Sequence, residues 1–136
     1  MKNEDCIFCK IVKGEIPCEK IWEDENTFAF LDVSPATEGH TLVIPKKHYE
    51  NIFDIPEKVL EEIMKTSQKI AKLLKERLLA DGINIFNSNN KVAQQEVFHY
   101  HIHIIPRYSR DKFKIVFNDT TKNKELKKIA EKIRGK

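Results

Sequence analysis

Three of the five histidines in the chain occupy alternate positions of one short segment, VFHYHIHII. They are His99, His101 and His103, and β-forming residues stand between them. Because the side chains of a β-strand alternate between its two faces, a strand here would place the three imidazoles on one face. The same alternation would direct the intervening side chains toward a core: Tyr100, Ile102 and Ile104.

The spacing of these histidines limits the chemistry open to them. Neighbouring side chains on one face of a strand lie about 6.5–7 Å apart, so His99 and His103 are separated by about twice that distance. One metal ion therefore does not suit all three, and we expect the histidines to divide between different roles. A neutral imidazole is a good nucleophile, and its ordinary pKa of about 6.5 also makes it a reasonable leaving group. The alternative, histidines without a function, is disfavoured because unpaired imidazoles are costly to bury.

Cys6 and Cys9 form a CxxC pair, which has the spacing of two zinc ligands. A structural zinc site needs four donors, and the chain has no second CxxC, so histidines are the remaining candidates for the other two. A redox pair is the rival interpretation, but such pairs normally occur in a βαβ context that this sequence does not predict. The third cysteine, Cys18, leaves an odd count, and with no apolar signal segment at the N-terminus a disulfide scaffold is not expected.

The elements that must position these residues follow from hydrophobic periodicity and turn residues. We expect a short helix, three strands, a long amphipathic helix starting at Pro56, and two further strands, the last of which carries the histidines. The predicted ranges are 5–13 for the short helix, 20–24, 27–33 and 41–44 for the first strands, 56–80 for the long helix, and 83–86 and 97–105 for the last strands. Strands grouped on either side of one helix indicate an α+β fold with a mostly antiparallel sheet.

The composition indicates a single soluble domain of 136 residues, 40% hydrophobic and 33% charged, with a net charge of +3. We expect it to be cytoplasmic, with no membrane partner, since no segment approaches the length of a membrane span. Residues 122–136 hold seven cations and two anions, but no basic face with interleaved aromatic residues accompanies them, so nucleic-acid binding is not expected. Apolar residues recur at helical spacing in this tail, which predicts an amphipathic helix docked on its own protein: Leu126, Ile129, Ala130 and Ile133.

Three sequence blocks, in order, carry a resemblance to a known family: CIFCKIVKGEIP, FAFLDVSPATEGHTLVIPKKH and AQQEVFHYHIHIIPR. Together they resemble the nucleotide-binding branch of the histidine-triad superfamily, over about residues 6–108. The resemblance implies one domain over residues 1–136, with 109–136 as a C-terminal tail. It also implies a five-stranded antiparallel sheet with one long helix and short terminal helices, and a homodimer that extends the sheet.

The resemblance implies a chemistry in which the middle histidine, His101, attacks the α-phosphate of a nucleotide. Water then hydrolyses the nucleotidyl-histidine intermediate, so we expect a hydrolase of purine nucleoside phosphoramidates, such as adenosine phosphoramidate or nucleotidyl-lysine. By position, His103 resembles the family histidine that binds phosphate oxygens, and His40 resembles one that supports the triad. Gln95 matches the family glutamine on the leaving-group side, and Ser88 matches a polar position that contacts phosphate.

The same resemblance implies a nucleoside site. Asp32 would accept hydrogen bonds from the ribose, while apolar groups would enclose the base: Phe8, Ile11, Ile16, Phe30 and Val33. From the residues alone, Phe30 and Val33 are equally well explained as core residues of a strand. A carboxylate before Ser34-Pro35 is either a turn cap or a ligand group.

In zinc-bearing members of this branch, the partners of the two cysteines correspond to His48 and His99. The resemblance therefore implies a closed, structural zinc site formed by Cys6, Cys9, His48 and His99, and no organic cofactor. The three histidines would then divide between two roles, since His99 would bind zinc and the other two, His101 and His103, would form the catalytic pair. Free or redox thiols remain the alternative.

Three residues depart from the family pattern. Asn90 and Gln94 stand where the family usually has glycine, and Glu96 replaces a hydroxyl residue. Asn tolerates a positive φ better than most residues, but Gln94 can narrow the phosphate loop. The Glu96 carboxylate can repel phosphate, or it can recognise a cationic leaving group such as an amine. The alternatives kept open are a dinucleoside polyphosphate hydrolase, a nucleotide-binding signalling module with little turnover, and a zinc-stabilised scaffold without a ligand.

Overall fold

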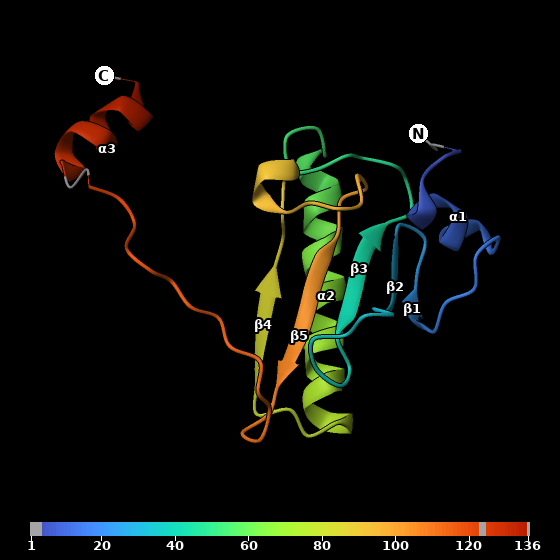
Figure 1. Cartoon of the computed structure of the whole chain (residues 1–136). Coiled ribbons are helices and arrows are strands. Elements are labelled where there is room, and N and C mark those ends of the chain that lie inside the picture. Colours follow the sequence, from blue (N-terminus) through green and yellow to red (C-terminus); the bar gives the residue numbers. More distant parts are fainter. Residues whose placement is uncertain (1–3, 123–124, 136) are drawn as a thin grey trace.

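The computed structural model describes residues 4–122 and 125–135; residues 1–3, 123–124 and 136 of the predicted domain lie outside this part. One antiparallel sheet has the strand order β1-β2-β3-β5-β4, and the long helix α2 lies against it (Figure 1). The strands are β1 Lys20–Glu23, β2 Thr27–Leu31, β3 Thr41–Pro45, β4 Gly82–Phe86 and β5 Ile102–Arg107. The helices are α1 Ile7–Lys13, α2 Glu57–Arg77, the 3₁₀ turn η1 Lys91–Ala93 and α3 Leu126–Arg134. The predicted α+β fold with a five-stranded antiparallel sheet and one long helix is confirmed.

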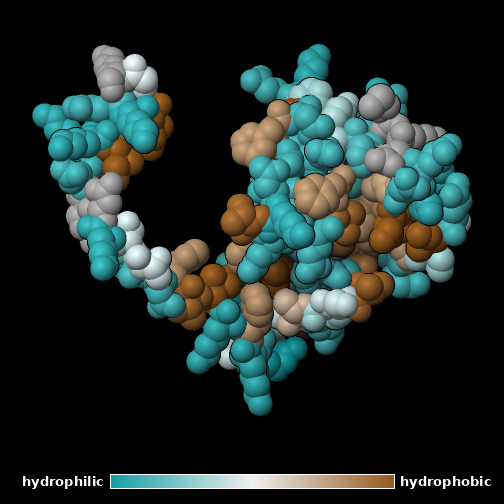
Figure 2. Space-filling view, turned by 45° about the horizontal axis from the view of Figure 1, so that its top comes forward, coloured by the Kyte–Doolittle hydropathy of each residue, from teal (hydrophilic) through white to brown (hydrophobic). Residues whose placement is uncertain are grey.

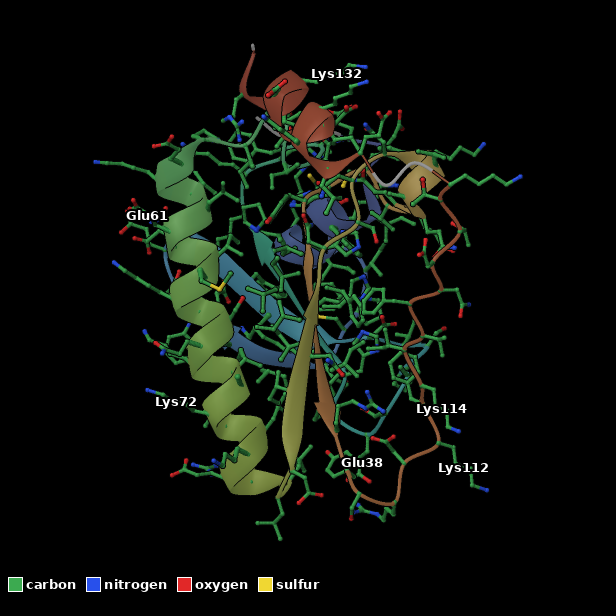
Figure 3. The ribbon with its side chains drawn as sticks, turned by 90° about the vertical axis from the view of Figure 1, so that its left-hand side faces the viewer. Glu38, Glu61, Lys72, Lys112, Lys114 and Lys132 are labelled. Carbon is green, nitrogen blue, oxygen red and sulfur yellow. The ribbon has the colours of Figure 1, made fainter. Side chains whose placement is uncertain are left out.

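The two faces of the sheet bury two different clusters, as the period of two along each strand requires. On one face, Val43, Ile102 and Ile104 pack with buried residues of α2, among them Ile63 and Ile70. The outer side of α2 is charged, and side chains such as Glu61 and Lys72 point away from the sheet (Figure 3). On the opposite face, neighbouring strand residues pack with α1: Phe28, Phe30, Leu42 and Ile44. This second face carries the candidate site.

The last strand begins later than the sequence predicts. We expected a strand over 97–105, but β5 begins at Ile102. The residues before it are held by hydrogen bonds to other parts of the chain instead of by pairing with a strand. The Tyr100 N–H donates to the Tyr49 carbonyl at 2.6 Å, and the His99 ring donates to the Pro45 carbonyl at 2.8 Å. The predicted alternation is nevertheless confirmed, since Tyr100 and Ile102 lie in the core cluster that packs on α2.

The predicted strand ends at residue 105, directly before Pro106, but β5 continues to Arg107, so Pro106 lies inside it. The Pro106 carbonyl accepts a hydrogen bond from Thr37 Oγ1 at 2.6 Å, so its main-chain groups face the loop before β3. They point away from β4, with which Arg107 and Ile105 continue the pairing. The proline therefore removes no ladder hydrogen bond from the sheet.

The C-terminal helix forms where predicted, but the expectation that it docks on its own protein is wrong. Leu126 is 75% exposed and Ile133 is 81% exposed. An extended segment after Asp111 carries α3 away from the sheet, and the apolar side of α3 faces the open space between them (Figures 1 and 2). None of the helices formed by the described residues is long and apolar enough to cross a membrane.

Candidate functional site

A cleft of about 670 Å³ lies on the face of the sheet opposite α2. Its lining comes from α1, from the strands β2 to β5, from the loops before β3 and β5, and from the segments that follow α1 and β5. Ten of the predicted site residues line it: Phe8, Ile11, Ile16, Phe30, Asp32, Val33, His40, Ser88, His101 and His103. The fold therefore brings together residues that are up to 95 positions apart in the chain.

One ring nitrogen of His101 makes a hydrogen bond to the main chain, and the other makes none within the described part of the chain. Its Nδ1 lies 2.7 Å from the carbonyl oxygen of His99, and since a carbonyl only accepts, Nδ1 carries the hydrogen. In the neutral ring, Nε2 then keeps an unprotonated lone pair. Burial lowers the pKa of His101 below its ordinary value, so the neutral form prevails at pH 7. The ring has the state that a nucleophile requires.

His40 and His103 form a second, oriented pair of imidazoles. The Ala36 N–H donates to His40 Nδ1 at 3.0 Å, so the hydrogen of the neutral His40 ring sits on Nε2. This Nε2 lies 2.9 Å from His103 Nδ1 and donates to it, which leaves the hydrogen of His103 on its own Nε2. Burial lowers the pKa of His103 to about 4, so at pH 7 it offers a neutral N–H donor beside His101.

The alternatives raised for the nucleoside residues are not mutually exclusive in the structure. Asp32 caps a turn, because its Oδ1 accepts from the Ser34 N–H at 2.8 Å, and it also lines the cleft. Phe30 is only 4% exposed and packs edge-on against Phe8, with ring centroids 5.4 Å apart, yet it too borders the cleft. Val33, by contrast, is 93% exposed and is not a core residue.

Gln95 does not line this cleft, although the sequence led us to expect it on the leaving-group side of the phosphate. Its buried side chain ties the loop before β5 to the loop after His48. Oε1 accepts from the Asn90 N–H at 2.7 Å, and Nε2 donates to the Glu50 carbonyl at 2.6 Å and to the Val97 carbonyl at 3.1 Å. The neighbouring Gln94 lines the cleft instead.

The two residues that stand in place of glycines adopt backbone conformations that favour glycine. Asn90 has φ of 76° and Gln94 has φ of 69°. Asn90 also has ψ of 158°, in a region almost confined to glycine, whereas Gln94 has ψ of 28° and lies in the left-handed helical region, so both residues carry backbone strain. The loop thus keeps a backbone conformation typical of glycine at these two positions, and Gln94 adds a side chain to the lining of the cleft.

Sequence reasoning did not identify two aromatic residues of the lining, Phe86 and Phe113. Phe86 had a usable signal, because it ends the predicted strand that comes directly before the histidine strand. In the structure these two strands pair, and Phe86 lies opposite His103. Phe113 had none, since a tertiary contact fixes it. The Arg107 guanidinium lies over its ring, 5.0 Å from the centroid, and is held by Asp111.

The four predicted metal ligands lie close together and outside the lining of the cleft. Each of Cys6, Cys9, His48 and His99 offers one ligand atom, and these four atoms lie within 4.8 Å of one another. Sγ-to-Nδ1 distances are 3.3 Å for Cys6–His99, 3.6 Å for Cys9–His99 and 3.5 Å for Cys9–His48. A tetrahedral zinc ion with ordinary bond lengths separates sulfur from nitrogen by about 3.6 Å. The donor set and its dimensions therefore fit a closed, structural zinc ion.

The HIT domain model matches residues 13–110. An uncharacterized HIT-like protein of Methanocaldococcus jannaschii, MJ0866, is 48% identical over 130 residues, covering 96% of this chain and 99% of that protein. Adenosine 5′-monophosphoramidase HNT1 of Saccharomyces cerevisiae is 45% identical over 102 residues, covering 75% of this chain and 62% of that protein.

Solved structures of similar proteins have the same fold as this chain. SMU.412c from Streptococcus mutans superposes with a TM-score of 0.91 at 44% identity, covering 98% of this chain and 85% of that chain. A zinc-bound histidine-triad family protein from Mycobacterium smegmatis superposes with a TM-score of 0.79 at 42% identity, covering 85% of this chain and 84% of that chain.

Removing one cluster ligand should release the metal. We expect Cys9→Ala to lose bound zinc and to lower Tm by about 10 °C or more, since losing a structural metal costs several kcal/mol. Zinc content would be measured by plasma mass spectrometry and Tm by calorimetry. Cys18→Ala is the control, because Cys18 lies outside the cluster. Unchanged zinc in Cys9→Ala would contradict the assignment.

His103 should make stability depend on pH in a defined window. Its pKa is about 4 when folded and 6.5 in an ordinary setting, so the unfolded chain takes up a proton first as the pH falls. The free energy of unfolding should therefore fall between about pH 6.5 and pH 4. We expect His103→Asn to reduce the loss between pH 7 and pH 5 by about 1 kcal/mol, allowing for the partial exposure of the ring. Parallel urea-unfolding curves at the two pH values would test it, and an identical loss in both proteins would refute it.

Proposed function

The chain belongs to the HIT domain family, and we propose that it hydrolyses purine nucleoside phosphoramidates through a covalent nucleotidyl intermediate on His101. The observation that carries the proposal is the hydrogen bond from His101 Nδ1 to the His99 carbonyl, which leaves Nε2 free in the cleft. The phosphoramidase activity named for the yeast relative supports this choice of substrate.

In the proposed complex, the nucleoside lies at the α1 and β2 end of the cleft. Phe8 and Phe30 offer aromatic surface there, and Ile11 and Ile16 complete an apolar wall for the base. The Asp32 carboxylate, which lines the cleft, would accept hydrogen bonds from the ribose hydroxyls. This assignment places the α-phosphate at His101 and His103, at the start of β5 on the same face.

In the first step, Nε2 of His101 attacks the α-phosphorus and the bond from phosphorus to the leaving nitrogen breaks. The amine departs with the bonding electron pair and takes up a proton from solvent. The Nε2–H of His103, with Ser88, stabilises the charge on the phosphate oxygens. In the second step, water attacks the phosphorus, the bond to His101 breaks, and a proton is released. The products are the amine, the nucleoside monophosphate and the unchanged enzyme.

The cluster of Cys6, Cys9, His48 and His99 serves as the structural zinc site of this fold, as the zinc-bound relative supports. All four positions are taken by protein ligands, so the ion has no position left for a reacting water. Its proposed contribution is to fix His99, whose carbonyl orients His101.

We also propose a homodimer that continues the sheet across β4. The sheet order leaves the outer edge of β4 without a neighbouring strand among the described residues, and Ile85 on this strand is 48% exposed. Sedimentation equilibrium should return twice the 16.0 kDa of the chain, and Ile85→Asp should shift it toward one copy. Ile21→Asp, on the opposite edge strand, is the control and should leave the dimer intact. A monomeric wild type would overturn this proposal.

The test of the reaction is rapid-quench trapping with radiolabelled adenosine 5′-phosphoramidate. We expect protein-bound label in the wild type and none in His101→Ala, with AMP release slowed at least about 10³-fold, because the variant lacks the attacking nitrogen. Zinc content and circular dichroism would establish that the variant is folded. Most of the activity surviving in His101→Ala would refute the nucleophile. No label and no AMP from the wild type, despite thermal stabilisation by AMP, would favour a nucleotide-binding module.

A further inference from the structure

The cleft has an unusual charge for a site that takes a phosphate. Among the described residues that line it, none is lysine or arginine. The only charged lining residues at pH 7 are two carboxylates, Asp32 and Glu96, because burial keeps the lining histidines neutral. The protein side of the cleft is therefore negative, and each further negative charge on a ligand is disfavoured.

The two carboxylates differ in how they are engaged. Asp32 Oδ1 accepts a hydrogen bond from the Ser34 N–H at 2.8 Å, and its Oδ2 lies 3.5 Å from Nε2 of His40, whose N–H is donated to His103. Glu96 is exposed and has no hydrogen bond or ion pair with any residue in the described part of the chain. It is nevertheless held in place, because the buried Gln95 beside it fixes the loop through Asn90 and Glu50. Glu96 thus presents an uncompensated carboxylate to whatever occupies the cleft.

The order of the strands assigns the two ends of the cleft. On the face opposite α2, the lining runs from Phe30 on β2, through Leu42 on β3 and His103 on β5, to Phe86 on β4. With the nucleoside at β2 and the phosphate at the histidines, the leaving group extends toward β4 and the loop that follows it. Phe86 and Phe113 provide aromatic surface at that end, and the loop contributes Glu96 to the lining of the same cleft.

We propose that Glu96 selects a leaving amine that carries a second, positively charged group; this inference rests on the hydrolysis proposed above. A carboxylate attracts a cation and repels an anion, and the faces of aromatic rings in the same cleft also attract cations. A nucleotide linked to a diamine or to lysine fits such a subsite. A dinucleoside polyphosphate does not, because its leaving group brings further negative charges to Glu96.

The test uses three adenosine 5′-phosphoramidates that differ in the charge of the leaving amine. N-(3-aminopropyl) carries a cation, N-butyl is neutral, and N-(3-carboxypropyl) carries an anion. We expect the ratio of kcat/KM for the cationic over the anionic compound to be at least about tenfold higher in the wild type than in Glu96→Gln. Comparing the two proteins cancels the intrinsic reactivity of each compound. The difference should shrink as salt is added.

Two further variants sharpen the result. Glu96→Lys should reverse the preference, whereas Glu61→Gln should keep the wild-type ratio, since Glu61 points to solvent from the outer side of α2 (Figure 3). Equal ratios in wild type and Glu96→Gln would overturn the inference. If the wild type hydrolysed none of the three compounds, the proposed function would fail instead. The dissociation constants of the same compounds would then decide whether Glu96 selects charge.

Discussion

The hydrogen bond from His101 Nδ1 to the His99 carbonyl is the interaction on which the site depends. It decides which nitrogen of His101 keeps its lone pair, and it holds only if residue 99 is fixed. The ring of His99 is anchored on both sides, with Nε2 on the Pro45 carbonyl and Nδ1 among the metal ligands. One residue therefore belongs to the metal cluster through its side chain and orients the proposed nucleophile through its main chain. In the proposed reaction, the metal would act by fixing this geometry, without contact with the substrate.

Burial and backbone hydrogen bonds together keep the histidines of the site neutral and oriented. Each of His40, His101 and His103 has its pKa lowered by burial, and each has its tautomer set by a main-chain group or by the next imidazole. A lysine or arginine would bind phosphate more strongly, but its charge would also bind product and would raise the cost of burial. Neutral N–H donors instead favour the state in which negative charge develops on the phosphate oxygens.

How far the sequence predicts this arrangement depends on which interactions decide each feature. Alternation along one segment was sufficient to separate Tyr100 and Ile102 from the histidines, because a period of two is a local property. The late start of β5 and the inward turn of Gln95 were not predictable, since their hydrogen-bond partners lie 45 to 54 residues away in the chain. His48 has no spacing signal of its own and followed only from family resemblance. The helical period of α3 showed that one face is apolar, but not what covers it.

The loop between β4 and β5 shows how one family scaffold can be altered at its site while its path is kept. Glycine-type backbone at residues 90 and 94 is retained although neither residue is glycine, at a strain of about 1–3 kcal/mol for each residue. Gln95 and its main-chain partners supply the constraint that holds this path. Because Gln95 holds the backbone from within the protein, the loop does not depend on the side chains at 94 and 96 for its path, and both of these side chains line the cleft.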